Sequence, residues 1–583
     1  MSSTTGARAD HAASSIKDTI TSIVIAFTMA FVFRGFVVEA FVIPTGSMAP
    51  TLMGAHMRFH GEDSGYAWQV GPWHYGPRNV PLPIQGASPL INRGARDARG
   101  IQITPIEVAD PMSGRRVTGP ASRDVPCLAG DRIFVVKYLQ PFFAPDRWDV
   151  AVFKNPTAPQ ENFIKRLVAM PGEQVALVDG DVFVREAPDG QAAGWDAGDW
   201  RIARKDERTQ RAVWQPVFDS GYEPLQGAAM FASPWRPSGP GWTMDRRRYT
   251  FRGEGEASLA WHAAGRRTTP FPGRIPAEVA TWAVNDFYPY NENTSSSFGG
   301  VDVFPVSDVR LSFAIEPDAG VAVSVTAELD ARGHEFRASI ETGGDGRGEA
   351  VIFKRRAGAG EWTELAREPL TRAITPGRTT NVEFWHADQS LSLWIEGRRV
   401  AEALYDWSPA ERISAATGRG FARLLAEDRE RMFSHLRDPS IYERPELRWR
   451  FDVARASGAG AEAGFALYRV RLDRDLFFQP GVYRPTSGHS LAGEPMIATH
   501  PTENPLVLTN EQFFTLGDNS PASSDGRAWD EPDPWVATLI DPTPGVVHQR
   551  LMIGKAFFVY FPAPHSLAGR SIIPDFGRLR FIW

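Results

Sequence analysis

A serine and a lysine that lie far apart in the chain could together carry out nucleophilic chemistry. Ser47 lies in the segment Ile43-Pro-Thr-Gly-Ser-Met-Ala-Pro-Thr-Leu52, in which a proline and a glycine favour a fixed turn. A serine hydroxyl is a weak nucleophile until a base accepts its proton. Lys165 could be that base, because it lies in an apolar stretch and burial can lower the pKa of a lysine by ~3–5 units. The apolar neighbours of this lysine are Phe163, Ile164, Leu167 and Val168.

A third segment supplies groups that could support a neutral lysine. Residues Gly517-Asp-Asn-Ser-Pro-Ala-Ser-Ser-Asp-Gly-Arg-Ala-Trp529 combine small, hydroxyl and acidic side chains, which could hydrogen-bond an amine and form an ion pair behind it. Each of the three signals also has an ordinary structural interpretation. Ser47 could be a plain turn serine, Lys165 could be an edge-strand lysine that points into water, and the third segment is typical of an Asx or Ser turn.

The overall composition limits the classes of protein to consider. With 583 residues the chain is too long for one ordinary core, so we expect roughly two to three globular units. A net charge of -6 gives no indication of nucleic-acid binding, and the single cysteine, Cys127, excludes an internal disulfide and a cysteine-based zinc site. The sequence contains no Gly-x-Ser-x-Gly elbow and no His-Glu-x-x-His motif, which argues against a classical Ser-His-Asp hydrolase and against a zinc metalloprotease.

An uncharged apolar stretch lies near the start of the sequence. It covers residues 19–33, has a basic residue on either side, and is followed by more apolar residues, while a bilayer span needs about 20 residues. The pattern predicts a transmembrane helix over residues 19–40 that follows a tail over residues 1–18. The alternative is a cleaved signal peptide, because the end of this stretch offers small residues at the positions that a cleavage site needs.

The remainder of the chain is mainly typical of β-structure. Residues 41–200 are predicted as short strands, with a Pro-, Gly- and Trp-rich irregular excursion over 57–127 that has no period. Asp179-Gly180 between two apolar runs predicts a type I′ hairpin. Residues 201–485 contain many period-two strands separated by Gly and Asp turns, which predicts a β-sandwich, and residues 486–583 return to short strands.

Taken together and in this order, these three segments and one further strand resemble the bacterial type I signal peptidase (leader peptidase) family, S26, which uses a serine/lysine dyad. The resemblance is confined to residues 16–56, 128–184 and 512–561. The sequence departs from the family pattern in three places: Thr45 stands where serine is common, Gly526 stands where serine is usual, and Ser520-Pro521-Ala522 replaces a more polar stretch. The four matching segments are Ser47-Met48-Ala49-Pro50-Thr51, Arg147–Pro156, Ile164–Glu173 and Gly517–Arg527.

The resemblance implies a role for each matching residue. Ser47 would attack the scissile carbonyl, and Lys165 would accept its proton and later return it to the leaving amine. The Thr45 hydroxyl and the Ser47 backbone N–H would form the oxyanion hole, and Ser523 would orient the lysine amine. The other implied positions are a supporting ion-pair shell and a pocket for a small substrate residue. The shell is Asp525, Arg166 and Arg527, and the pocket is Ile43, Met48, Leu52, Phe163 and Ile164.

The same resemblance implies an architecture and a function. We expect a mainly β fold: one N-terminal transmembrane helix, a signal-peptidase-type antiparallel β catalytic domain in two parts (41–200 and 486–583), and an inserted laminin-G/concanavalin-like β-sandwich over 201–485. The implied function is a membrane-bound endopeptidase that removes signal peptides from exported preproteins after small-x-small sites, with no cofactor and no metal. The implied partners are preproteins and the lipid bilayer, with no nucleic acid. The implied location is the bacterial cytoplasmic membrane, with a single span and the catalytic domain outside.

The insert has a weaker resemblance of its own. Residues Val382–Gly397 have the strand, the Asp-containing turn and the Trp-x-x-Gly ending of laminin-G and concanavalin-like sandwiches. This resemblance implies either a module that binds a glycan or protein ligand or a structural spacer. The alternative function for the whole chain is therefore a catalytically inactive, membrane-tethered, lectin-like binding protein.

Overall fold

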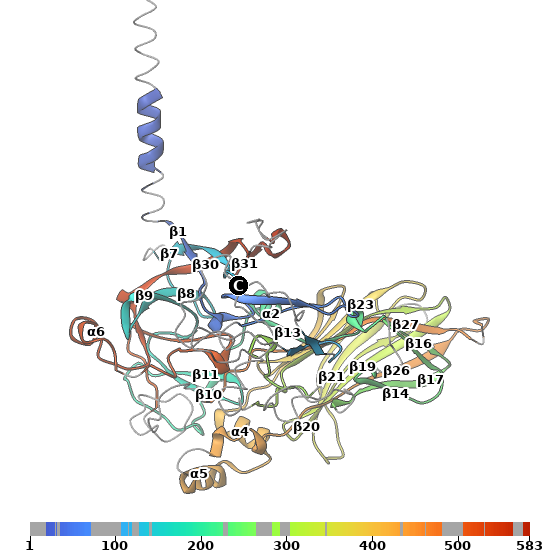
Figure 1. Ribbon diagram of the computed structural model, residues 1–583. Helices are drawn as coiled ribbons and strands as arrows, with labels where there is room; N and C mark the ends of the chain where they lie inside the picture. Colours follow the sequence, from blue (N-terminus) through green and yellow to red (C-terminus); the bar gives the residue numbers. More distant parts are fainter. Residues whose placement is uncertain are drawn as a thin grey trace, which may run out of the picture.

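The computed structural model describes residues 19–29, 31, 35, 37–71, 107–114, 116–118, 127–138, 143–225, 231–263, 283–291, 303–343, 347–431, 435–460, 462–480, 505–529, 531–563 and 575–583. Within these residues the structure is mainly β, as the sequence predicts (Figure 1). Two large β-structures make up most of the molecule, and several smaller sheets and short helices connect them.

The first sheet joins strands from both ends of the chain, and every pair in it is antiparallel. Alternate residues of its central strand β8 enter two different cores, because successive side chains of a strand point to opposite faces. Val150 and Val152 pack in one core, and Ala151 and Phe153 pack in the other. In spatial order the strands are β1 (Val38–Val42), β7 (Arg132–Lys137), β30 (Met552–Phe561), β8 (Val150–Asn155), β9 (Ala158–Ala169), β28 (Gln512–Leu516) and β29 (Val547–His548), with β31 (Arg580–Phe581) paired to β30.

A three-stranded sheet follows directly in the sequence and consists of β10 (Glu173–Val178), β11 (Asp181–Glu186) and β12 (Arg201–Ile202). Strands β10 and β11 pair with Val178 opposite Asp181, which leaves Asp179 and Gly180 as a two-residue loop. Both loop residues have positive φ, 50° and 87°, as a type I′ turn requires. The predicted hairpin is confirmed.

The second β-structure is a sandwich of two sheets that lies within the predicted insert, 201–485. One sheet has eight strands in the order β15-β16-β27-β18-β23-β24-β25 with β13 beside β27, and the other has seven in the order β14-β17-β26-β19-β20-β21-β22. The strands are β13 (Gln215–Asp219), β14 (Trp235–Ser238), β15 (Trp242–Asp245), β16 (Arg248–Arg252), β17 (Gly255–Trp261), β18 (Val309–Pro317), β19 (Val321–Ala331), β20 (His334–Thr342), β21 (Gly348–Arg356), β22 (Thr363–Leu370), β23 (Thr380–Ala387), β24 (Ser390–Ile395), β25 (Arg398–Leu404), β26 (Glu446–Arg455) and β27 (Gly464–Arg474).

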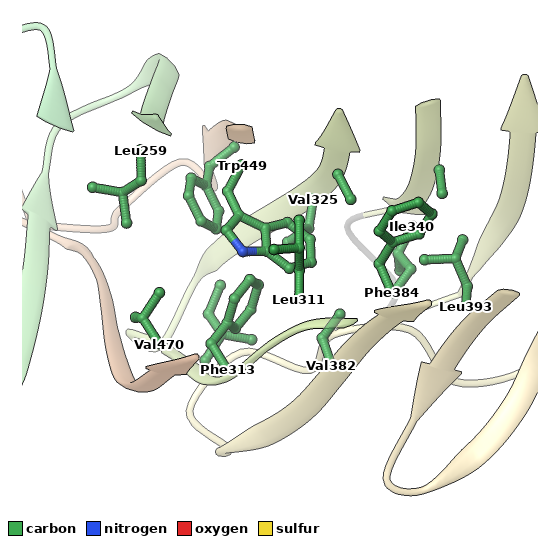
Figure 2. Close-up of a cluster of buried hydrophobic side chains, with 14 of the residues drawn as sticks. Leu259, Leu311, Phe313, Val325, Ile340, Val382, Phe384, Leu393, Trp449 and Val470 are labelled. Atoms are coloured by element: carbon green, nitrogen blue, oxygen red, sulfur yellow. The ribbon is translucent and has the colours of Figure 1, made fainter. Parts of the chain in front are cut away.

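The core of the sandwich forms because each strand turns every second side chain inward. In β18 the buried positions alternate with half-buried ones along the whole strand. Figure 2 shows side chains from both sheets, among them Leu311, Phe313 and Trp449, meeting between the layers. The rings of Phe313 and Trp449 lie edge to face with their centres 4.6 Å apart. Full burial of such side chains contributes roughly 1.5–3 kcal/mol each, so this core stabilises the insert.

Short helices and small sheets complete the described structure. Helix α4 contacts β10, and side chains of α4 and α5 pack in a core with β10 and β11 rather than between the layers of the sandwich. The α-helices are α2 (Glu207–Val213), α4 (Pro409–Thr417), α5 (Phe421–Glu430) and α6 (Pro534–Leu539). The 3-10 helices are η1 (Gly46–Met48), η2 (Ser220–Tyr222), η5 (Pro289–Asn291), η6 (His435–Arg437), η7 (Pro439–Ile441), η8 (Ser520–Ala522), η9 (Gln549–Leu551) and η10 (Phe576–Arg578). The small sheets are β3 (Ala67–Val70)–β2 (His56–His60)–β6 (Cys127–Leu128) and β4 (Glu107–Ala109)–β5 (Arg116–Thr118).

Two boundaries differ from the sequence prediction. Part of the excursion predicted as irregular over 57–127 is regular, since β2 and β3 form a hairpin whose Met57 and Trp68 are buried. Its short strands carry few residues each, so no period is visible in the sequence. The predicted helix over 19–40 also ends earlier, because Val38–Ala40 pair with β7 as part of strand β1.

The helix itself covers residues 19–29 and stands clear of the β-structure in Figure 1. Over the described residues, the structure has no helix that combines the length and the apolar character needed to cross a bilayer. Residues 1–18 and part of the stretch up to Phe36 lie outside the described residues.

Candidate active site

The serine lies on the first turn after strand β1. Helix η1 holds Ser47 with a bond from the Ala49 N–H to the Gly46 carbonyl of 3.0 Å, and Ser47 is 8% exposed. Gly46 is required here, because a Cβ at this position would overlap the ring of Tyr290. The turn is therefore packed against the ring of Tyr290, and Ser47 is almost fully buried.

The lysine lies on strand β9, which contacts helix η1, and its side chain reaches the serine. The Lys165 Nζ atom is 2.9 Å from Ser47 Oγ and donates to the Ile164 carbonyl at 3.1 Å. Lys165 is 3% exposed, and this burial lowers its pKa to about 8, against the opposing effect of Asp525 and Asp518. A lysine with this pKa is neutral in a useful fraction near pH 8 and can accept the serine proton.

A buried ion pair involves Arg166, the residue after the lysine on strand β9. The Arg166 guanidinium binds Asp518 with two hydrogen bonds of 2.7 Å, and both side chains are fully buried. The Thr51 hydroxyl also donates to Asp518, so the pair ties β9 to the end of β28 and to the serine turn. Two further bonds from Arg166 reach the backbone carbonyls of Trp148 at 2.8 Å and Trp583 at 3.1 Å.

A second buried ion pair lies close to the lysine. Arg527 donates to Asp525 at 2.9 Å and 2.7 Å, and the Gly517 N–H donates to the same carboxylate at 2.9 Å. Burial alone would raise the pKa of Asp525, but the Arg527 charge and these hydrogen bonds outweigh it and hold the pKa below its ordinary value. Asp525 is therefore a fixed negative charge close to Lys165.

Ser523 and Thr45 lie beside the dyad with looser contacts. Ser523 is 2% exposed and close enough to Asp525 to help lower the pKa of that carboxyl, but within the described residues its hydroxyl makes no hydrogen bond of normal geometry. A Cβ on Gly517 would overlap Ser523 Oγ and would lie 2.6 Å from the Ser47 carbonyl, so this glycine lets the two loops approach. The Thr45 hydroxyl lies 3.4 Å from Ser47 Oγ. Their roles in orienting the lysine and in the oxyanion hole stay predictions.

The residues expected to line a substrate pocket divide between two cores. Ile43, Met48 and Leu52 are buried in one core, and Ile164 packs against it. Phe163 instead packs against the core that contains Trp529, and its ring centre lies 4.9 Å from Lys165 Nζ. The pocket itself remains a prediction from the resemblance.

The site includes residues that the sequence reasoning did not assign. Asp518 and Asn519 follow Gly517 in a segment that the sequence did single out, so their types offered a signal. Asn519 donates to the Gly46 carbonyl at 3.0 Å, and its N–H donates to the Ser47 carbonyl at 3.0 Å. Tyr290 and Asn291 come from the predicted insert, and nothing in the local sequence connects them to the serine.

A cluster of three buried carboxylates could in principle hold a cation, since their oxygens lie within 4.8 Å of one another. Basic side chains already engage each of them, and Arg332 and Arg412 also bind Asp179, so ion pairs join the β10–β11 hairpin to the sandwich and to helix α4. The pairs are Asp181–Arg412 at 2.5 Å, Asp308–Arg332 at 2.6 Å and Asp388–Lys205 at 2.6 Å.

Comparison with known proteins assigns one region of the chain. Residues 117–214 match the family model described as signal peptidase, peptidase S26. This region contains β7 to β12 and the lysine, and it is signal-peptidase-like. At this coarse level, the match supports a hydrolase, a peptidase of the signal peptidase kind. No curated protein matches the chain.

Solved structures resemble the β-structure at low similarity. The carbohydrate-binding module CBM66 from Bacillus subtilis is 9% identical with a TM-score of 0.21, over 42% of this chain and 96% of that one. The galectin LEC-6 from Caenorhabditis elegans is 11% identical with a TM-score of 0.16, over 29% and 82%. SCLam, a non-specific endo-beta-1,3(4)-glucanase of family GH16, is 10% identical with a TM-score of 0.18, over 29% and 58%. The strand pairing of the two sheets itself defines the sandwich.

Proposed function

We propose that this protein is a membrane-bound endopeptidase that removes N-terminal signal peptides from exported preproteins after small-x-small sites. Ser47 is the nucleophile and Lys165 is the general base. The observation that carries the proposal is the 2.9 Å distance between Lys165 Nζ and Ser47 Oγ in a buried setting that lowers the lysine pKa to about 8. The match of residues 117–214 to the signal peptidase family supports the reaction class.

The geometry supports a sequence of proton transfers through one amine. Neutral Lys165 accepts the Ser47 proton as the oxygen attacks the scissile carbonyl. The Thr45 hydroxyl and the Ser47 N–H then stabilise the oxyanion, whose charge develops in the transition state. Protonated Lys165 then gives the proton to the leaving amine of the substrate. The neutral amine of Lys165 next activates the water that hydrolyses the acyl-enzyme.

Two features support a place at the membrane. The helix over 19–29 exposes apolar side chains on all sides, including Ile20, Phe27 and Met29, and an apolar helix of this kind is unfavourable in water. Phe576 and Phe581 near the C-terminus are also exposed. In this proposal the helix and the residues after it up to Val37, which are apolar apart from Arg34 and Gly35, form the single membrane span, and the catalytic domain lies on the outer side of the bacterial cytoplasmic membrane.

The test is cleavage of a preprotein in detergent by the wild type, Ser47→Ala and Lys165→Ala, with the cut site read by mass spectrometry. We expect cleavage after a small-x-small site, its loss in both variants, and no effect of metal chelators. Activity that survives Lys165→Ala would overturn the dyad. Absence of cleavage by the folded wild type would instead favour a membrane-tethered binding protein whose sandwich holds a glycan or protein ligand.

A further inference from the structure

One segment of the predicted insert leaves the sandwich and lies against the serine turn. It is the described stretch 283–291, which comes between strands β17 and β18 and ends in helix η5. We propose that Asn291 and Tyr290 of this segment are positioning residues for Ser47. The inference rests on the proposed function and adds to it that the inserted domain is required for the reaction.

The first contact is a pair of side-chain amides. Asn291 donates to the Asn519 Oδ1 atom at 2.6 Å, and Asn519 donates in return to Asn291 Oδ1 at 2.9 Å. Asn519 in turn donates from its side chain to the Gly46 carbonyl and from its backbone to the Ser47 carbonyl, both at 3.0 Å. Both amides are buried, so each unpaired group would carry a desolvation cost. Asn291 thus holds Asn519 in place, and Asn519 in turn holds the serine turn.

The second contact is the ring of Tyr290. Its hydroxyl donates to the Ala55 carbonyl at 2.8 Å, and its own carbonyl accepts from the Gly71 N–H at 2.8 Å. The ring fills the space that a side chain at position 46 would need, and it packs in one small core with Ala49. The ring of Tyr290 therefore packs directly against the turn that carries the serine.

The same segment also reaches the lysine side of the dyad. Gln479 donates from its side chain to Asp286 at 2.6 Å, and its carbonyl accepts from Arg527 at 2.9 Å. Arg527 is the partner of Asp525, the charge that most strongly raises the pKa of Lys165. One short segment therefore braces both the nucleophile turn and the ion pair behind the base.

Such bracing matters because the reaction depends on a short distance between two atoms. A displacement of about 1 Å between reacting groups can lower a rate by about 10²-fold. We therefore expect Asn291→Ala to lower kcat by about 10- to 100-fold while KM changes by less than about 3-fold, because this side chain binds Asn519, which holds the serine turn.

The matched control is Asn285→Ala. Asn285 is an asparagine of the same segment whose side chain accepts from the Phe287 N–H at 3.1 Å, away from the serine turn. We expect Asn285→Ala to keep kcat within about 3-fold of the wild type. Equal losses of kcat in both variants would show that the segment acts through general folding, and this outcome would overturn the proposal.

A double-variant cycle tests whether Asn291 acts through Asn519. If it does, Asn291→Ala combined with Asn519→Ala lowers kcat little more than Asn519→Ala alone, whereas independent effects multiply. Tyr290→Phe, which keeps the ring and removes the bond to Ala55, serves as a milder variant if Asn291→Ala does not fold. Wild-type kcat in both Asn291→Ala and Tyr290→Phe would overturn the proposal. Failure of the wild type to cleave at all would refute the proposed function itself, which is a separate result.

Discussion

Two buried lysines of this protein lie in opposite electrostatic settings. Lys165 and the side chain of Lys205 are each 3% exposed. Each Nζ lies over an aromatic ring, 4.9 Å from the centre of Phe163 and 5.1 Å from that of Trp148. Burial opposes the charge on both. It lowers the pKa of Lys165 to about 8, whereas at Lys205 neighbouring carboxylates outweigh it and raise the pKa above its ordinary value.

The difference lies in which cation the carboxylates contact. Lys205 Nζ touches Asp388 at 2.6 Å and Asp475 at 3.0 Å, so its charge is paired directly. Near Lys165 the carboxylates are equally close to a cation, but that cation is an arginine in each case. Arginines cannot lose their proton, so they pair with the nearby carboxylates permanently. The buried lysine is then left without a carboxylate partner and can be neutral, as a base must be. The two arginine pairs are Asp518 with Arg166 and Asp525 with Arg527.

The largest expected difference between the two lysines is in activity. Lys165→Met removes the proposed base, and we expect kcat to fall by at least about 10⁴-fold, since loss of one member of a catalytic unit removes most of its effect. Lys205→Met should keep kcat per folded molecule within about 3-fold. Preprotein cleavage in detergent measures both. If kcat fell by a similar factor in both variants, Lys165 would not differ from a structural cation such as Lys205.

The next largest effect is on stability, and here the order reverses. Lys205→Met leaves Asp388 and Asp475 buried without their partner, and we expect the free energy of unfolding to fall by about 3–5 kcal/mol. Because the folded pKa of Lys205 is raised, this stabilisation is fully present below the unfolded pKa of about 10.4 and is lost as pH rises through the folded value. Urea unfolding at pH 7 measures it.

The control for this measurement is Lys154→Met, at an exposed position of strand β8. A change of no more than about 0.5 kcal/mol is expected there. A cost for Lys205→Met as small as the cost at Lys154 would contradict the direct pairing.

A smaller effect of opposite sign is expected for Lys165→Met. A lysine whose folded pKa is lowered to about 8 binds fewer protons than in the unfolded chain, so its charge is penalised most below pH 8. At 1.36 kcal/mol per pKa unit this penalty is of the order of 3 kcal/mol, so removal of the amine at pH 7 should leave stability unchanged or raise it by up to about that amount. A clear loss of stability in urea unfolding at pH 7 would show that the charge of Lys165 is paired after all.

The smallest expected effect is a shift of the pH profile. We expect kcat/KM to rise as pH increases through about 8, because Lys165 must be neutral to accept the serine proton. Asp525→Asn removes the charge that most raises the pKa of this lysine, so the midpoint should move to lower pH. Glu161→Gln, at an exposed position of the same strand β9, should leave the midpoint in place. An upward shift in Asp525→Asn would contradict the assigned electrostatics.

The sequence predicted the parts of the fold that repeat a local rule. The alternation in Val309–Pro317 is that of a strand with one buried face. The pair Asp179-Gly180 strongly favours a two-residue hairpin turn, because both positions need a positive φ. Short strands such as β2 carry too few residues for a period, and the boundary at Val38 depends on pairing with β7 rather than on apolar character. These two features could not be predicted from local pattern.

The same distinction applies to the site. Their types and neighbours made Ser47 and Lys165 candidates, the family resemblance implied their roles, and the structure places their side-chain atoms 2.9 Å apart. The resemblance groups Arg166 with Asp525 and Arg527 in one ion-pair shell. In the structure Arg166 instead pairs with Asp518, which lies 352 positions away in the sequence and had no predicted role. Asn291 carried no signal at all, because its role depends on where a long insert folds back.

The order of strands in the first sheet also determines when the protein can become active during its synthesis. The sandwich is complete once Arg474 has emerged from the ribosome, whereas β9 still lacks β28 and β8 still lacks β30. The carboxylates of Asp518 and Asp525 arrive with that late part of the chain. A nascent molecule therefore carries its serine and its lysine for most of translation without the strands that align them, and the proposed dyad can form only when the last strands are in place.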